Sequence, residues 1–293
     1  MQADQPRVAF VGAGAVGLTL AQAMDQAGIT VTALYSRGRE HLAAEASARV
    51  PTALVTASAQ DAVDRADLVF LSVPDDAVRP VCLALAWRPG QAVVHCSGAT
   101  ELDALASAAA TGAAVGAFHP IQMFTPSPAT LAALPGSTVT IDAGEPLAST
   151  LDGLARRIGC RAVRLEATGR RAAYHASAYY VGPFLIALMR EAAAIWQELG
   201  ATEAEALAAL LPLLRGTVAA VEDRGLAGGM GGCIARGDTG TVEGHLAALD
   251  AWSPEAGRLY RALALRTIPL ALARGSLAPD RAERIRAALT PDA

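Results

Sequence analysis

The chain has 293 residues, of which 53% are hydrophobic and 18% charged, and its formal net charge at pH 7 is −4. This size and composition fit one large or two medium folded domains, and they exclude a disordered chain or one that coats nucleic acid. All 24 basic residues are arginine, so no lysine is present to act as a general acid or to form a Schiff base.

The first predicted strand, Val8–Val11, runs into glycines at positions 12, 14 and 17 that open a helix. A side chain at Gly12 or Gly14 would block the turn and hold a pyrophosphate off the backbone, and Gly17 lets the helix pack closely on the strand. The helix N-terminus supplies N–H groups for phosphate oxygens. We therefore expect the whole turn to bind a dinucleotide: Gly12, Ala13, Gly14, Ala15, Val16 and Gly17.

The tip of the second predicted strand, residues 29–35, distinguishes between two cofactors. A unit that binds NAD(H) usually places a carboxylate here for the ribose 2′-hydroxyl. This chain has Ser36, Arg37 and Arg39 instead, and guanidinium groups pair with a 2′-phosphate. The sequence therefore predicts NADP(H), with an arginine-rich solvated loop as the alternative.

Further predicted strands at 50–56, 68–73 and 92–96 alternate with helices at 61–65, 78–86 and 102–110, which indicates a doubly wound parallel sheet of the Rossmann type. Ligands of such sheets lie beyond the carboxyl ends of the strands. This rule adds four residues to the expected cofactor site: Val73, Pro74, Ser97 and Gly98.

The chain continues with a predicted strand from residue 115 and a β-α-β unit at 137–165. After this unit the sequence shows only helical periodicity. We expect an α/β domain at 1–166 and an all-α second domain at 167–293, whose first helix is kinked at Gly182-Pro183. No apolar run is long enough to span a bilayer. The four cysteines lack metal-ligand spacing, so we expect reduced thiols, no metal and a cytoplasmic location.

Hydride transfer to a C=O or C=N carbon needs a group that orients or protonates the substrate. His119 stands at a strand tip before a proline, and a structural histidine there is the alternative. On the first helix of the second domain, His175 and Tyr179 share a face that suits a cleft, whereas Tyr174 and Ser177 lie together on another face. We assign His119, His175 and Tyr179 to catalysis.

A third cluster combines Arg236, Asp238, Thr239 and Thr241 with glycines at the start of a helix. Such a loop can hold a carboxylate. The alternative is a capped loop in which Asp238 or Thr239 is the N-cap and Arg236 pairs with Asp238.

Four motifs together resemble a known family: VAFVGAGAVG with Ser36-Arg37, HPIQMF at 119–124, YHASA at 174–178 and GCIARGDTGTVEGHL at 232–246. They are similar to the bacterial Rossmann-like plus DUF2520 proteins, which are related to pyrroline-5-carboxylate reductase, ketopantoate reductase and the F420-dependent NADP oxidoreductases. The resemblance covers essentially the whole chain. It implies an NADP-binding domain, a helical domain that builds a homodimer, and a site in the cleft between them.

Two departures from the relatives matter. The β-hydroxyacid dehydrogenases use a lysine on the first helix of the second domain, and this chain has none. Where the family often shows Ser-Asn-Phe, this chain has Val181-Gly-Pro-Phe184.

The resulting hypothesis is an NADPH-dependent reductase of a small, carboxylate-bearing imine or 2-keto acid. Gln122, Tyr174, Ser177, Arg236, Asp238, Thr239 and Thr241 are expected to bind the substrate. An imine is favoured because a protonated C=N needs little acid assistance. A non-catalytic NADP(H)-responsive binding protein and an F420-linked NADP reductase are the alternatives. We expect neither nucleic acid nor membrane as a partner.

Overall fold

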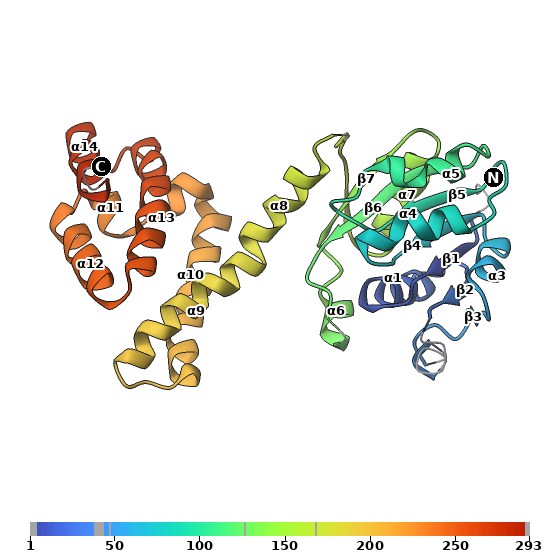
Figure 1. Cartoon of the computed structure of the whole chain (residues 1–293), viewed down its shortest axis with the longest axis horizontal. Coiled ribbons are helices and arrows are strands. Elements are labelled where there is room, and N and C mark those ends of the chain that lie inside the picture. The colour runs from blue at the N-terminus through green and yellow to red at the C-terminus, as the bar shows by residue number, and fades with distance from the viewer. Residues whose placement is uncertain (1–4, 38–43, 47, 126, 168, 291–293) are drawn as a thin grey trace. The chain divides into compact units, whose positions relative to one another are not determined.

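A computed structural model describes residues 5–290 except 38–43, 47, 126 and 168. The chain forms two compact units, Met1–Pro183 and Phe184–Ala293. Figure 1 shows the strands and the helices that surround them in the first unit, and the helices of the second. The sequence predicts a domain boundary after residue 166. The first compact unit extends past that point and also contains the helix Arg171–Val181.

The first unit contains a sheet of eight strands in the order β3-β2-β1-β4-β5-β6-β7-β8. Its neighbouring strands are parallel except β6 and β7, which pair antiparallel. The predicted doubly wound α/β fold is confirmed. The strands are β1 (Val8–Val11), β2 (Val31–Tyr35), β3 (Leu54–Val55), β4 (Leu68–Leu71), β5 (Ala92–His95), β6 (Ala114–Ile121), β7 (Thr138–Ala143) and β8 (Arg161–Arg164).

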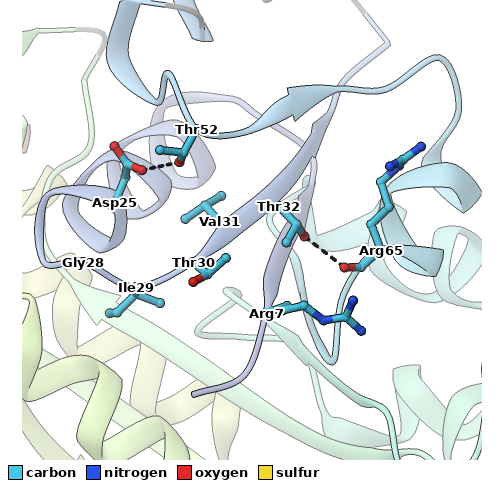
Figure 2. Close-up of a pocket in the computed structure, with 9 residues that line it drawn as sticks. All are labelled: Arg7, Asp25, Gly28, Ile29, Thr30, Val31, Thr32, Thr52 and Arg65. Carbon is cyan, nitrogen blue, oxygen red and sulfur yellow. Dashed lines mark hydrogen bonds between the residues drawn. The ribbon is translucent and has the colours of Figure 1, made fainter. Parts of the chain in front are cut away.

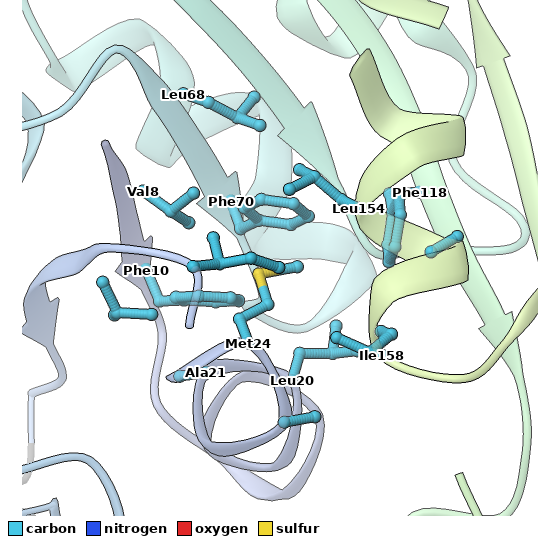
Figure 3. Close-up of a cluster of buried hydrophobic side chains, with 14 of the residues drawn as sticks. Val8, Phe10, Leu20, Ala21, Met24, Leu68, Phe70, Phe118, Leu154 and Ile158 are labelled. Carbon is cyan, nitrogen blue, oxygen red and sulfur yellow. The ribbon is translucent and has the colours of Figure 1, made fainter. Parts of the chain in front are cut away.

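Helices cover both faces of this sheet because its central strands are apolar on both sides. In Figure 3, Phe10 and Phe70 stack with ring centroids 4.8 Å apart, over Met24 of α1 and beside Leu154 of α7. The other face is covered by α3, α4, η1 and α5. The helices of this unit are α1 (Ala15–Gln26), α3 (Ala59–Asp64), α4 (Asp75–Ala84), η1 (Leu102–Leu105), α5 (Ala106–Ala109), α6 (Pro128–Ala132), α7 (Leu147–Arg157) and α8 (Arg171–Val181).

The second unit is helical, as the sequence predicts. Its core gathers Ile234, Val242, Ile268 and Ile285 from the last four helices. The helices are α9 (Pro183–Glu198), α10 (Glu203–Gly229), α11 (Gly232–Arg236), α12 (Thr239–Trp252), α13 (Pro254–Ala273) and α14 (Pro279–Leu289). The break between α8 and α9 falls at the predicted glycine–proline pair, because proline has no N–H to continue the helical hydrogen bonds. The glycine-rich segment 225–240 holds the end of α10, all of α11 and the start of α12.

Two helical segments expose much of their apolar surface. Only Ala193 of α9 and Ala206 of α10 are buried. By length and composition alone, Arg171–Glu198 and Glu203–Gly229 could each cross a membrane, although no apolar run of that length was expected. Exposed apolar faces of this size are also typical of surfaces between protein subunits.

Candidate functional site

The strand register places the predicted loops together at the carboxyl end of the sheet. Val11 pairs with Tyr35 and Leu71, Leu71 pairs with His95, and His95 pairs with Ala117. The carboxyl ends of β2, β1, β4 and β5 therefore lie in one row, level with Ala117 in the middle of β6. The segments that continue from these four strands are 36–37, 12–14, 72–74 and 96–98, and residues 118–121 of β6 extend past the end of β5.

The three glycines of the turn meet different surroundings. Gly12 has φ +97°, and a Cβ there would lie 2.6 Å from the carbonyl oxygen of Ser72. A Cβ on Gly17 would overlap the Gly12 carbonyl oxygen and the Ser72 hydroxyl, which donates a 2.5 Å hydrogen bond to that carbonyl. A Cβ on Gly14 would meet no described atom within 4 Å. Gly12 and Gly17 thus serve the packing of the turn, and Gly14 faces open space.

The N-terminus of α1 suits an anion. Its N-cap is Gly14, no side chain of the described residues caps it, and its first turn contains no acidic residue. Backbone N–H groups in a first turn have no partner within their own helix and carry the positive end of the helix dipole. The turn therefore presents N–H groups beside the open face of Gly14.

A cavity of about 390 Å³ adjoins this turn. Seven of the predicted cofactor residues line it: Gly12, Ala13, Gly14, Ser36, Arg37, Val73 and Pro74. Ala15, Val16 and Gly17 continue into α1, Ser97 and Gly98 lie on the loop after β5, and Arg39 is outside the described residues. The remaining lining residues, which were not predicted from the sequence, are mostly small or apolar: Val11, Tyr35, Ala59, Ser72, Ala77, Val81, Ala84 and Leu85.

A larger cavity of about 530 Å³ lies at the amino ends of the strands, around Gly28, Thr30 and the start of β2 (Figure 2). Two arginines line it, and each already forms an ion pair. Arg7 Nη2 lies 2.8 Å from Asp67 Oδ1, and Arg65 Nε lies 3.0 Å from Asp61 Oδ1. This end of the sheet is away from the glycine turn. We therefore place the candidate site at the 390 Å³ cavity.

Past the carboxyl end of β5, the structure brings the predicted histidines together. The His119 and His175 ring centroids are 5.8 Å apart, and those of His175 and Tyr179 are 5.7 Å apart. A Cβ on Gly98 would lie 2.6 Å from His175 Cδ2 and 2.7 Å from His119 Cε1. Gly98, expected to line the cofactor, therefore also makes room for the two rings.

Tyr174 belongs to the same cluster, although it shares no predicted helix face with His175. Its hydroxyl lies 2.7 Å from His119 Nδ1 and 2.6 Å from the hydroxyl of Thr140. Thr140 could not be predicted from the sequence, because a threonine inside a strand carries no motif.

A buried arginine, Arg171, anchors the helix that carries Tyr174 and His175. Arg171 is only 2% exposed, and its guanidinium lies 3.0 Å from Asp142 Oδ2 and donates to the Ser97 carbonyl at 2.9 Å. The Glu101 carboxylate accepts the backbone N–H groups of Gly169 and Arg171. These bonds hold the start of α8 against the loop after β5 and against β7.

Burial and nearby charge keep two histidines neutral. Burial, then the charges of His175 and Arg171, lower the pKa of His119 to about 4. Burial, followed by the charge of Arg171, lowers the pKa of His95 to about 4. Burial also raises the pKa of Tyr174. At neutral pH the rings of His119 and His95 are thus uncharged, and the Tyr174 hydroxyl is protonated.

The lowered pKa of His95 leads to a prediction about acid stability. His95 is fully buried, and the unfolded chain takes up its proton below about pH 6.5, whereas the folded chain does so only near pH 4. The free energy of unfolding should therefore fall as the pH drops from 6.5 to 4, by about 3 kcal/mol from this group. Urea unfolding of wild type and His95→Leu across this range measures the difference.

The stability of His95→Leu should depend less on pH than that of wild type. His245→Gln, which changes an exposed histidine, is the matched control and should retain the wild-type slope. Equal slopes for wild type and His95→Leu would show that His95 is not the group responsible.

Two predicted substrate residues are engaged in hydrogen bonds with backbone groups of the first unit. The Gln122 side-chain amide donates to the Ala133 carbonyl at 3.0 Å and accepts the Met123 N–H at 2.8 Å. The exposed Ser177 hydroxyl donates to the carbonyl of Tyr174, three residues before it on α8, at 2.6 Å. These bonds give both side chains a structural role.

In the second unit, the loop before α12 is capped. The Asp238 carboxylate accepts the Thr241 N–H at 3.0 Å and its hydroxyl at 2.6 Å, and Asp238 is the N-cap of the helix. These two bonds lower the pKa of Asp238, so its negative charge occupies the place expected for an anion. Arg236 is exposed at the end of α11, and within the described chain no ion pair joins it to Asp238. The capped-loop alternative thus describes Asp238 and Thr241.

The four cysteines are free thiols. Among the described residues, no three or more histidine, cysteine, aspartate or glutamate side chains gather as metal ligands would.

The fold and the glycine turn define a Rossmann-like protein with a helical second unit. Family models agree: residues 1–120 match a Rossmann-like domain, and residues 137–267 match a domain of unknown function, DUF2520. The chain is therefore a Rossmann-like plus DUF2520 protein, as its motifs indicated. No curated protein matches it.

Solved structures share this fold at low sequence identity. A protein of Bacteroides fragilis assigned as an NADP oxidoreductase is 23% identical, with a TM-score of 0.69 over 90% of this chain and 98% of that one. A reductive aminase of Aspergillus terreus, solved with NADPH and ethyl-5-oxohexanoate, is 18% identical, with a TM-score of 0.65 over 96% and 98%. A pyrroline-5-carboxylate reductase of Coxiella burnetii is 14% identical, with a TM-score of 0.60 over 96% and 99%.

Proposed function

We propose that this protein is a cytoplasmic, NADPH-dependent reductase that transfers hydride to a small imine or 2-keto acid bearing a carboxylate. The main support is one arrangement at the carboxyl end of one sheet. The glycine turn with its cavity follows β1, and His119 lies on β6 just past the level of the end of β5, with its ring beside that of His175. Structures of similar fold include a reductive aminase bound to NADPH and a pyrroline-5-carboxylate reductase.

The cavity suits a phosphorylated dinucleotide. The open face of Gly14 and the N–H groups of α1 would take the pyrophosphate. Ser36 and Arg37 would take the 2′-phosphate. The apolar wall formed by Val81 of α4 and by Leu85, which follows the helix, would cover the adenine. When bound, NADPH supplies the hydride.

The histidine cluster would orient the substrate. His119 is neutral at pH 7 and Tyr174 is a weaker acid than usual, so neither readily gives up a full proton. A protonated C=N accepts hydride without further acid, whereas a ketone needs a proton for the developing alkoxide. We therefore favour the imine, with His175 and Tyr179 beside the reacting group.

Arg236 and Thr239 remain the residues predicted to bind the substrate carboxylate, since Asp238 and Thr241 are engaged in the cap. We also propose that a second copy of the chain covers the exposed apolar side chains of two helices, which include Ile186 of α9 and Leu213 of α10. Burial of such side chains is the usual driving force for association.

Replacing Arg37 by aspartate should weaken NADPH binding far more than NADH binding. The change removes a cation that would face the 2′-phosphate and adds a charge that repels it, so we expect a loss of at least about 30-fold for NADPH, or about 2 kcal/mol. NADH, which lacks that phosphate, should change by less than about threefold. Fluorescence titration with each nucleotide measures both.

Arg284→Asp is the charge-matched control, because that arginine is 63% exposed on α14 in the other unit. It should leave both affinities unchanged. Equal weakening of NADPH and NADH by Arg37→Asp would remove the assignment of NADP(H).

Loss of NADPH absorbance with a panel of cyclic imines and 2-keto acids tests catalysis itself. Turnover of an imine would support the proposal. NADPH binding without turnover across the panel would favour a non-catalytic NADP(H)-binding protein. Oxidation of reduced F420 with NADP would favour the deazaflavin-linked reaction.

A further inference from the structure

Three side chains from different elements of the first unit form a connected hydrogen-bond network. His119 of β6 and Thr140 of β7 are directly paired in the antiparallel ladder. Tyr174 of α8 places its hydroxyl 2.7 Å from His119 Nδ1 and 2.6 Å from Thr140 Oγ1. The Thr140 hydroxyl also donates to the His119 carbonyl at 3.3 Å.

The number of available protons determines which group donates in each hydrogen bond of this network. Each hydroxyl has one proton, and a carbonyl oxygen can only accept. If Thr140 donates to the carbonyl, Tyr174 must donate to Thr140, and His119 Nδ1–H must donate to Tyr174. All three contacts are then hydrogen bonds. In the reverse order, Thr140 donates to Tyr174 and Tyr174 to Nδ1, and the contact to the carbonyl is lost.

The charge state of the His119 ring connects these hydrogen-bond directions to the position of its proton. Burial and the charges of His175 and Arg171 lower the pKa of His119 to about 4, against the opposing charge of Asp75. The ring therefore carries one proton at neutral pH, and a proton on Nδ1 leaves Nε2 as an acceptor.

Nε2 faces the loop after β5. A Cβ on Gly98 would lie 2.9 Å from this nitrogen. Because Gly98 has no side chain, none covers Nε2 from this loop.

We infer that Thr140 and Tyr174 are positioning residues that hold the proton of His119 on Nδ1, so that Nε2 accepts a hydrogen bond from the substrate. This inference rests on the proposed reductase function for its consequence. The reacting group should carry an N–H, as a protonated imine does, because a bare keto oxygen would face a lone pair. Hydride then adds to the carbon, the C=N π electrons pass to nitrogen, and the amine keeps its proton.

The tautomer can be observed directly by long-range ¹H–¹⁵N NMR on protein labelled with ¹⁵N-histidine at pH 7. His119→Asn assigns the His119 signals among the five histidines. In wild type we expect a protonated Nδ1 and an unprotonated Nε2. Thr140→Val keeps the shape of the side chain but removes the acceptor of Tyr174, which should turn to Nδ1 and move the proton to Nε2.

Thr140→Ser restores the hydroxyl and should restore the wild-type tautomer. A protonated Nε2 in wild type, or the same tautomer in wild type and Thr140→Val, would overturn the inference. The wild-type spectrum alone decides the first point if Thr140→Val does not fold. The spectra need neither NADPH nor substrate, so their outcome is separate from that of the nucleotide titrations that test the proposed function.

Discussion

Replacing Gly14 by alanine is expected to abolish tight NADPH binding while leaving the fold intact. The added methyl group meets no described atom within 4 Å, and the backbone at Gly14, with φ −77° and ψ −165°, is open to any residue. The free energy of unfolding should change by less than about 1 kcal/mol, the usual cost of alanine at an N-cap. The methyl group would, however, hold a pyrophosphate off the α1 N–H groups, with a loss on the order of 100-fold in affinity.

Gly17→Ala is the matched variant, because it adds the same methyl group one helical turn later. There it would overlap the Gly12 carbonyl oxygen and the Ser72 hydroxyl. Overpacking should outweigh the helix propensity of alanine and lower the free energy of unfolding by about 2 kcal/mol. Thermal unfolding and NADPH titration of both variants separate the two effects. Wild-type affinity in Gly14→Ala would contradict the assignment of the turn to the cofactor.

The second large effect is expected from the buried ion pair beneath the histidines. Arg171→Met should lower the free energy of unfolding by about 3–5 kcal/mol, because it leaves the Asp142 carboxylate uncompensated in a site where that side chain is only 12% exposed. It also removes the hydrogen bond to the Ser97 carbonyl. Urea unfolding at pH 7 measures the loss.

Two comparisons make this result specific. Arg171→Met combined with Asp142→Leu should recover much of the stability, since no charge is then left unpaired. Arg284→Met, at a pair whose side chains are 63% and 74% exposed, should cost less than about 1 kcal/mol. A similar small cost for Arg171→Met would show that this pair does not anchor α8.

Most of the fold could be predicted from local pattern. Continuous apolar runs gave the buried strands, and Gly182-Pro183 gave the break between α8 and α9. The antiparallel pairing of β6 with β7 was missed, because apolar periodicity carries no information on strand direction. The short α11 was also missed, since glycines surround it and are typical of loops.

The candidate site divides in the same way. The glycine turn and the Ser36–Arg37 tip follow a spacing that local chemistry determines, so they were found. The contact of Tyr174 with Thr140 joins residues from separate elements, and helix periodicity placed Tyr174 on a different face from His175. The Arg171–Asp142 pair was missed for a similar reason: its partners lie 29 residues apart in the sequence.

A crystal structure of the protein grown with NADPH tests the central claim most directly. We expect the pyrophosphate against residues 12–14 and the N-terminus of α1, the 2′-phosphate beside Arg37, and the nicotinamide toward Gly98 and the histidine pair. NADPH bound in the cavity of Figure 2, or a glycine turn covered by the protein's own atoms, would contradict the account.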